Sequence, residues 1–128
     1  MSNFHCDTFS PNAINTAVDG STTVVSDPIS LNGTVAVNVQ VVCKNGAAGT
    51  LYIDGTNQVV PSGENQASQA LTPVWVNATS QALTANQTLV QFFSLTDQIT
   101  SMSQMRCRFA PTSAGNVQVS VNARGIDN

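Results

Sequence analysis

The chain of 128 residues carries a formal net charge of −3, and only 9% of its residues are charged, against about 25% in an average soluble protein. Its length fits one domain, and its acidic balance excludes the basic patch that a nucleic-acid partner requires. No apolar stretch approaches the ~20 residues of a membrane span, and residues 1–10 lack the basic start and apolar centre of a secretory signal. We therefore expect a single domain that folds in the cytoplasm, with neither nucleic acid nor membrane as a partner.

The missing charge is replaced by Ser, Thr, Asn and Gln, so that Lys44 and Glu64 are the chain's one lysine and one glutamate. Lysine and glutamate lose most side-chain entropy when a contact forms, and both are depleted at the cores of interfaces. Such a composition favours a surface made for lasting association. The alternative is a β-protein that is simply rich in Thr and Asn, and composition alone leaves both open.

Residues 2–20 show weak periodicity and end in Asp19-Gly20, which is a turn signal. We expect an N-terminal arm over residues 1–20, with at most one short strand near residues 14–18, followed by a β-sandwich domain over residues 21–128. In the arm, Phe4 and Phe9 are candidate contacts for assembly with neighbouring subunits.

After the arm, apolar and polar residues alternate in short runs, as is typical of strands with one buried face. The clearest run is residues 34–43, where one face carries Val35, Val37, Val39, Val41 and Cys43. The other strands are expected over residues 22–26, 50–54, 74–76, 89–95, 105–109 and 117–124.

Two segments stay ambiguous. A helix is the rival interpretation for residues 94–102, although their Ser and Thr give poor helix propensity. The polar stretch over residues 58–70 is either a mobile loop or a segment that a neighbouring subunit orders, and we expect it to make intersubunit contacts.

The last two strands are joined by residues 111–116, which are rich in Gly and Ser and predict a hairpin. Arg106, Arg108 and Arg124 fall on the outward faces of these strands. The sequence thus predicts three of the four cations on one sheet surface, either as solvated edge protection or as donors to the carboxylates of a neighbouring subunit.

These elements predict an all-β, single-domain antiparallel β-sandwich. We favour a jelly roll over immunoglobulin-like connectivity because about eight strands are expected. In addition, Trp75 lies too far downstream of Cys43 for an immunoglobulin core, and Met105 stands where a tyrosine corner would need Tyr. In a reducing cytosol, Cys43 and Cys107 are expected to be small buried hydrophobes, with a disulfide between them as the alternative.

Nothing in the chain predicts catalysis. The single histidine, His5, is followed by Cys6 and Asp7, but adjacent residues of an extended segment point to opposite sides. The sequence has no Gly-rich phosphate loop and no metal-ligand spacing, and aspartates such as Asp54 and Asp97 stand singly, as turn residues ordinarily do. We expect no catalytic residue, no metal site and no cofactor.

Four segments together resemble a loose group of small phage structural proteins with a β-sandwich fold. They are a Gly-Thr-led strand with its turn, a Trp-Val strand, an Arg-x-Arg strand and a closing Val-rich strand ending in Arg-Gly, found at residues 49–57, 73–76, 106–109 and 117–125. The pattern departs from the group after Asn57, where Gln58-Val59 replaces Asp-Gly. The resemblance implies a part of a bacteriophage particle, such as a head decoration protein, a small capsid subunit or a tail component.

On this basis we expect a virion structural protein that is made in the host cytoplasm. It would assemble with itself, as a trimer or pentamer, and with other virion proteins. The alternative is a carbohydrate- or receptor-binding module of a tail or spike, for which Tyr52 and Trp75 are the available amphipathic aromatics for a ligand platform.

Overall fold

The structure, a computed structural model, describes residues 8–31, 34–57, 74–93, 99 and 102–125. Eight strands make up nearly all of the regular structure in these ranges. They are β1 (Thr8–Asp19), β2 (Val24–Val25), β3 (Ile29–Ser30), β4 (Thr34–Lys44), β5 (Ala48–Thr56), β6 (Val76–Leu83), β7 (Thr88–Phe93) and β8 (Gln104–Gly125).

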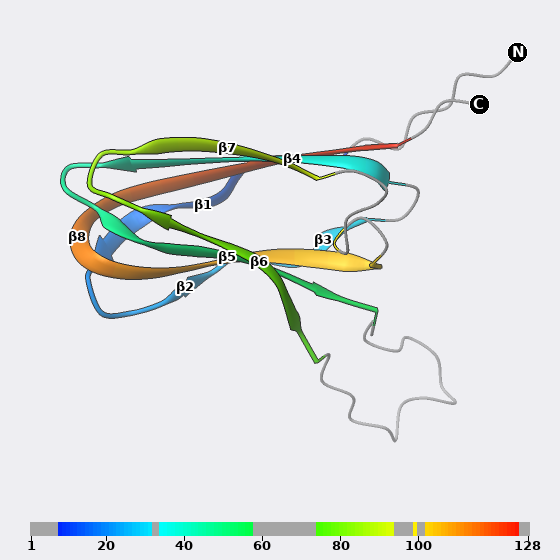
Figure 1. Ribbon diagram of the computed structural model, residues 1–128, viewed down its shortest axis with the longest axis horizontal. Coiled ribbons are helices and arrows are strands. Elements are labelled where there is room, and N and C mark those ends of the chain that lie inside the picture. Colours follow the sequence, from blue (N-terminus) through cyan, green and yellow to red (C-terminus); the bar gives the residue numbers. More distant parts are fainter. Residues whose placement is uncertain (1–7, 32–33, 58–73, 94–98, 100–101, 126–128) are drawn as a thin grey trace, which may run out of the picture.

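The strands form two facing layers, and every strand pairing is antiparallel (Figure 1). One layer, called here the β4 layer, has the strand order β1-β8-β4-β7. The other, called the β5 layer, has the order β6-β5-β8, with the short strands β2 and β3 on the far side of β8. The predicted all-β, single-domain β-sandwich is therefore confirmed.

Strand β8 belongs to both layers. Over its 22 residues, the first part pairs with β5, β2 and β3, and the part after Ser113 pairs with β1 and β4. Figure 1 shows it running along one layer, bending at one end of the molecule and returning along the other. The predicted hairpin is wrong, because the two halves of β8 pair with other strands and not with each other.

The bend of β8 occurs at a β-bulge. Gly49 is registered with Pro111 but Ala48 with Ser113, so Thr112 has no partner in β5. Proline lacks the N–H that a regular ladder needs and is tolerated at bulges. Residues that predict a turn thus make a strand bend from one layer into the other.

The turns at this end of the sandwich are tied to the bend. The β4–β5 turn uses left-handed backbone at Asn45 (φ 56°) and Gly46 (φ 91°). The backbone N–H of Gly46 donates to Asn86 Oδ1 (3.1 Å), and Ser113 Oγ donates to the carbonyl of Gly46 (2.6 Å). The β4–β5 turn, the turn between β6 and β7 that contains Asn86, and the bend of β8 are therefore linked by hydrogen bonds.

The core lies between the two layers. On β8 the odd-numbered residues face it in both halves, so the bend keeps the apolar face inward. Cys43 and Cys107 are both free and buried, as predicted. The buried hydrophobic residues are Ile14, Val18, Ile29, Leu31, Val37, Val39, Val41, Cys43, Ala47, Leu51, Ile53, Leu83, Ile99, Met105, Cys107, Phe109, Val117, Val119, Val121 and Ala123.

The segment expected to be an arm is largely a strand of the sandwich. β1 pairs with β8 from Thr8 opposite Ala123 to Asp19 opposite Ala114. Ile14 and Val18 lie in the core. Residues 1–7, which include Phe4, lie outside the described ranges, so the expectation of an arm is corrected for residues 8–19.

Other expected elements differ in extent. The strand expected at residues 74–76 begins only at Val76 and continues to Leu83. The ambiguous stretch 58–70 and most of 94–102 lie outside the described ranges. In the part of the chain that the structure describes, no helix has the length and apolar character needed to cross a membrane.

Replacing Ile14 with Ala tests whether β1 is a core strand. Because Ile14 is buried between the layers, we expect the free energy of unfolding to fall by about 2–5 kcal/mol. Asn15→Ala, at the exposed neighbouring position, should change it by less than about 0.5 kcal/mol. Urea unfolding followed by circular dichroism gives both values, and equal effects would contradict the assignment.

Replacing Gly49 with Ala tests the contact between β5 and the bend. An added Cβ would lie 2.3 Å from the carbonyl oxygen of Ala110 and 2.7 Å from Cα of Pro111, so we expect a loss of at least about 2 kcal/mol. At Gly46 the atom nearest to an added Cβ would be 3.5 Å away. Gly46→Ala should therefore lower the free energy of unfolding by only about 1–2 kcal/mol, because alanine disfavours left-handed backbone. Thermal unfolding of both variants makes the comparison, and a smaller loss for Gly49→Ala would contradict it.

Candidate functional site

A buried carboxylate stands on the outer side of the β5 layer. Along β5, Leu51 and Ile53 face the core, and Tyr52 and Asp54 alternate with them. The side chain of Asp54 is 2% exposed, whereas those of Arg106 and Arg108 are 26% and 30% exposed. The two arginines therefore cover the aspartate.

Every accepting position of this carboxylate is used. Oδ2 of Asp54 accepts from Nε of Arg106 (3.0 Å) and from Nε of Arg108 (2.9 Å). Oδ1 accepts from Nη2 of Arg108 (3.2 Å) and from Nδ2 of Asn77 (3.1 Å). A carboxylate has about four lone-pair sites, so Asp54 holds three strands together and is saturated in doing so.

Each guanidinium also lies over an aromatic ring. Cζ of Arg106 is 4.6 Å from the ring centroid of Trp75, and Cζ of Arg108 is 4.2 Å from that of Tyr52. Cation–π contacts of this kind are attractive and fix the plane of the guanidinium. We call the whole group the arginine cluster, which consists of Tyr52, Asp54, Trp75, Asn77, Arg106 and Arg108.

The cluster is charged at neutral pH. Burial alone would raise the pKa of Asp54, but hydrogen bonds from Arg108, Asn77 and Arg106 outweigh it and hold that pKa below its ordinary value. The hydrogen bond to Asp54 raises the pKa of Arg108. With two guanidinium groups and one carboxylate, the cluster carries a net charge of about +1.

An exposed aliphatic side chain lies beside the cluster, and two more lie next to Trp75 in the sequence. The large hydrophobic residues that are exposed in the described chain are Val25 (48%), Val74 (65%) and Val76 (46%). Val25 is registered with Arg108 across the β2–β8 pair, and the other two flank Trp75 in the sequence. Trp, Tyr and Arg beside apolar side chains are the composition of binding hot spots at protein interfaces.

The structure joins residues that the sequence assigned to two different functions. Arg106 and Arg108, predicted as assembly contacts, stack on Trp75 and Tyr52, predicted as a ligand platform. Arg124 is not with them: it lies in the half of β8 that belongs to the β4 layer, registered with Ala36. The predicted cluster of three arginines is wrong because β8 carries its two halves to different layers.

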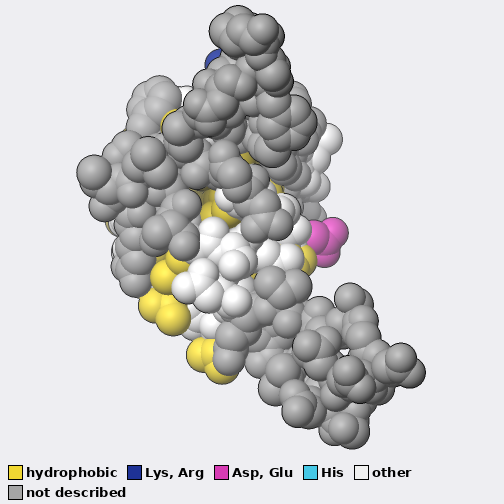
Figure 2. Space-filling view, turned by 90° about the vertical axis from the view of Figure 1, so that its right-hand side faces the viewer, with side chains coloured by type: hydrophobic (Ala, Val, Ile, Leu, Met, Phe, Trp, Pro, Cys, Tyr) yellow, Lys and Arg dark blue, Asp and Glu magenta, His cyan; other side chains and the backbone are white. Residues whose placement is uncertain are grey.

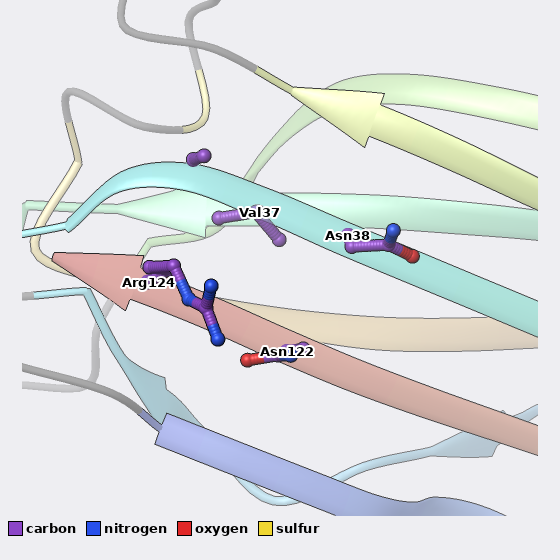
Figure 3. Close-up of a pocket in the computed structure, with 5 residues that line it drawn as sticks. Val37, Asn38, Asn122 and Arg124 are labelled. Atoms are coloured by element: carbon purple, nitrogen blue, oxygen red, sulfur yellow. The ribbon is translucent and has the colours of Figure 1, made fainter.

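Arg124 instead lines a small hollow on the β4 layer. Figure 3 shows it beside Asn122 on β8, with Asn38 and Val37 on the neighbouring strand β4. The hollow measures about 200 Å³ and is completed by Ala36. Phe9, the other assembly candidate within the described ranges, lies in β1 opposite Asn122; the structure does not describe its side chain.

Sequence reasoning missed Asp54 and Asn77. Asp54 resembled a turn residue because Gly55 follows it. A signal was present, since Asp54 shares a strand face with Tyr52 and an Arg-x-Arg strand places two cations on one face. The pairing of Asp54 with Arg106 across two strands was needed to connect them.

The cluster suits binding more than reaction. Asp54 stays ionised and Arg108 stays protonated near neutral pH. Burial, followed by the nearby charge of Asp54, raises the pKa of the Cys107 thiol to about 12, so it is not a nucleophile. Among the described residues, no group of three His, Cys, Asp or Glu is placed to hold a metal ion.

Replacing Asp54 with Asn tests the stabilising role of the carboxylate. Because the folded pKa is lowered, the stabilisation is present above the unfolded pKa of about 3.9 and disappears as the pH falls through the folded value. At pH 7 we expect Asp54→Asn to lower the free energy of unfolding by roughly 3 kcal/mol. In urea unfolding the difference from the wild type should shrink at the acid end, and a difference independent of pH would contradict the assignment.

The matched control for this variant is Asp27→Asn. Asp27 lies between β2 and β3, two strands of the β5 layer, and is exposed. Its replacement therefore removes the same charge without breaking a buried pair. We expect its unfolding free energy at pH 7 to stay within about 0.5 kcal/mol of the wild type.

No known protein-family model matches this chain, and no curated protein sequence matches it. Solved structures do match. The structure of the SPBc2 prophage-derived protein YomS is similar with a TM-score of 0.59 and 11% sequence identity, over 98% of each chain. The PBSX exported protein XepA is similar with a TM-score of 0.62 and 13% identity, over 96% of this chain but only 38% of the XepA chain.

A viral protein also matches. A structure of infectious bursal disease virus, Gx strain, is similar with a TM-score of 0.53 and 10% identity, over 98% of this chain and 33% of that one. At these identities the likeness is one of fold. The chain thus has an all-β sandwich fold that is also found in proteins of prophage and virus origin.

Proposed function

We propose that this chain is a non-enzymatic structural protein of a bacteriophage particle. The observation that carries the proposal is the end-to-end similarity in fold to the prophage-derived protein YomS, which covers 98% of both chains. The fold similarity to a prophage exported protein and to a virus structure supports the same origin. The charge-poor composition, at 9% charged residues, suits a subunit that stays assembled.

The arginine cluster supplies a contact surface for this role. It places two arginines and two aromatic rings beside the exposed Val25 on the outer side of one layer. In a particle each contact is repeated by symmetry, so a modest interface in each copy is sufficient. We propose self-association, as a trimer or pentamer, attachment to a shell as a decoration or cement protein, or both.

One end of the sandwich suits assembly as well. Figure 2 looks at the end of the sandwich that lies on the right in Figure 1, where the described atoms in view are hydrophobic side chains, backbone and uncharged side chains, with acidic atoms at one edge. Weakly hydrated surfaces of this kind lose little solvation when a neighbour covers them. The protein would then be made in the host cytoplasm and end in the virion.

A carbohydrate-binding role at Tyr52 and Trp75 is less well supported. Sugar rings stack on open aromatic faces, but in this chain a guanidinium already lies over each ring, at 4.2 Å from Tyr52 and 4.6 Å from Trp75. The stacking of the two arginines on these rings therefore favours contact with a protein over binding of a sugar.

Co-sedimentation tests the proposal. Particles are prepared from cells in which the phage or prophage that encodes the chain is induced, and they are separated on a density gradient. We expect the chain in the particle fractions at a fixed ratio to the major shell protein, as detected by mass spectrometry. The control is the same chain expressed without phage induction, which should stay at the top of the gradient.

A chain that stays in the soluble fractions of the induced cells, with particles present, would contradict a virion role. Light scattering of the purified protein tests the finer proposal of self-association. A trimer or pentamer is expected from a self-assembling subunit, and a monomer at all concentrations would leave attachment to another shell protein as the mode of assembly.

A further inference from the structure

We infer that the arginine cluster is a binding site for a carboxylate group presented by a neighbouring protein. The inference rests on the proposed function only for the statement that this neighbour is a subunit of the same particle. It is supported by the hydrogen bonds within the cluster and by the guanidinium N–H donors that have no acceptor among the described residues.

The cluster has more donors than its own carboxylate can accept. Each guanidinium has five N–H donors, and within the described residues only Nε of Arg106 and Nε and Nη2 of Arg108 donate to Asp54. Both Nη groups of Arg106 are left without a partner among these residues, and the side chain is 26% exposed. A second carboxylate would accept hydrogen bonds from these surplus donors and would be attracted by the net positive charge of the cluster.

The geometry holds Arg106 ready for such a ligand. Its Nε is bound to Asp54 at 3.0 Å and its face lies over Trp75, so the side chain is already ordered before a ligand arrives. Less conformational entropy is then lost on binding. The Nη edge presents two parallel N–H groups, which is the geometry for bidentate binding of a carboxylate.

The surroundings favour a protein ligand over an acidic sugar. Val25, which is registered with Arg108, is exposed beside the cluster, and an apolar side chain next to a charged contact excludes water when a protein covers it. An acidic sugar would gain from stacking on Tyr52 or Trp75, whose rings already carry the guanidinium groups. The expected ligand is therefore a Glu or Asp side chain flanked by aliphatic residues.

Nuclear magnetic resonance of the arginine side chains tests the inference. The probes are acetyl-Val-Glu-Val-amide and acetyl-Val-Gln-Val-amide, added to the full ¹⁵N-labelled chain at neutral pH and low salt. We expect the Glu peptide to bind with a Kd on the order of 1 mM and to shift the Nε–H and Nη–H signals of Arg106. The Gln peptide should shift them at least fivefold less at the same concentration.

Two variants locate the site. Arg106→Gln should abolish the shifts elsewhere in the cluster, while Asp54 keeps its bonds to Arg108 and Asn77 and the fold is checked by circular dichroism. Arg106→Lys, which keeps the charge but not the two parallel donors, should bind at least fivefold more weakly. Arg124→Gln removes the same charge from the other layer and should leave binding unchanged.

Three results would overturn the inference: no shift with the Glu peptide, equal shifts with both peptides, or equal loss in Arg106→Gln and Arg124→Gln. Stronger binding of trigalacturonate than of the Glu peptide would overturn the choice of a protein ligand. Peptide binding by a chain absent from particles would refute the proposed function alone. A chain that co-sediments with particles but does not bind the peptide would refute this inference alone.

Discussion

The whole fold depends on one strand that serves as the central partner in two layers. β8 pairs with β1 and β4 in one layer and with β5, β2 and β3 in the other. The transition between layers is possible because Thr112 is left out of the ladder and because glycines lie where the chains approach most closely. At Gly115, for example, an added Cβ would lie 2.3 Å from the backbone N of Ala47. A shift of β8 would therefore disturb both layers together.

The second constraint is the burial of Asp54. A buried carboxylate is destabilising unless it is paired and fully hydrogen-bonded, and this one draws its donors from β6 and β8. A slip of β8 by one residue would turn both arginines to the opposite face and leave the aspartate buried without partners. The same bonds that fix the register also fix the two guanidinium groups that face outward, so fold specificity and surface chemistry have one cause.

Local alternation predicted the strands, but long-range pairing decided how they are used. Residues 34–43 and 105–109 alternate with period two and form strands as expected. Residues 111–116 carry the composition of a turn, which is also that of a bulged bend, so the hairpin was wrong. β1 was missed because the register shifts between Ser10 and Ile14 and interrupts its period. The arginines and the aromatic residues of the cluster were found as two separate sites, and Asp54 and Asn77 were missed, since nothing local shows that β5, β6 and β8 are neighbours.

The position of β8 in the chain also sets an order of events in folding. The segment that completes both layers is synthesised after all the strands that it pairs with, and β1 pairs with residues about a hundred positions later in the chain. Contacts of such long sequence separation slow folding, and unpaired strands are exposed to aggregation in the meantime. Asp54 likewise has no arginine to pair with until β8 has been made. The surface that would recognise a neighbour therefore comes into existence only with the finished domain, which keeps incomplete chains out of any assembly that depends on it.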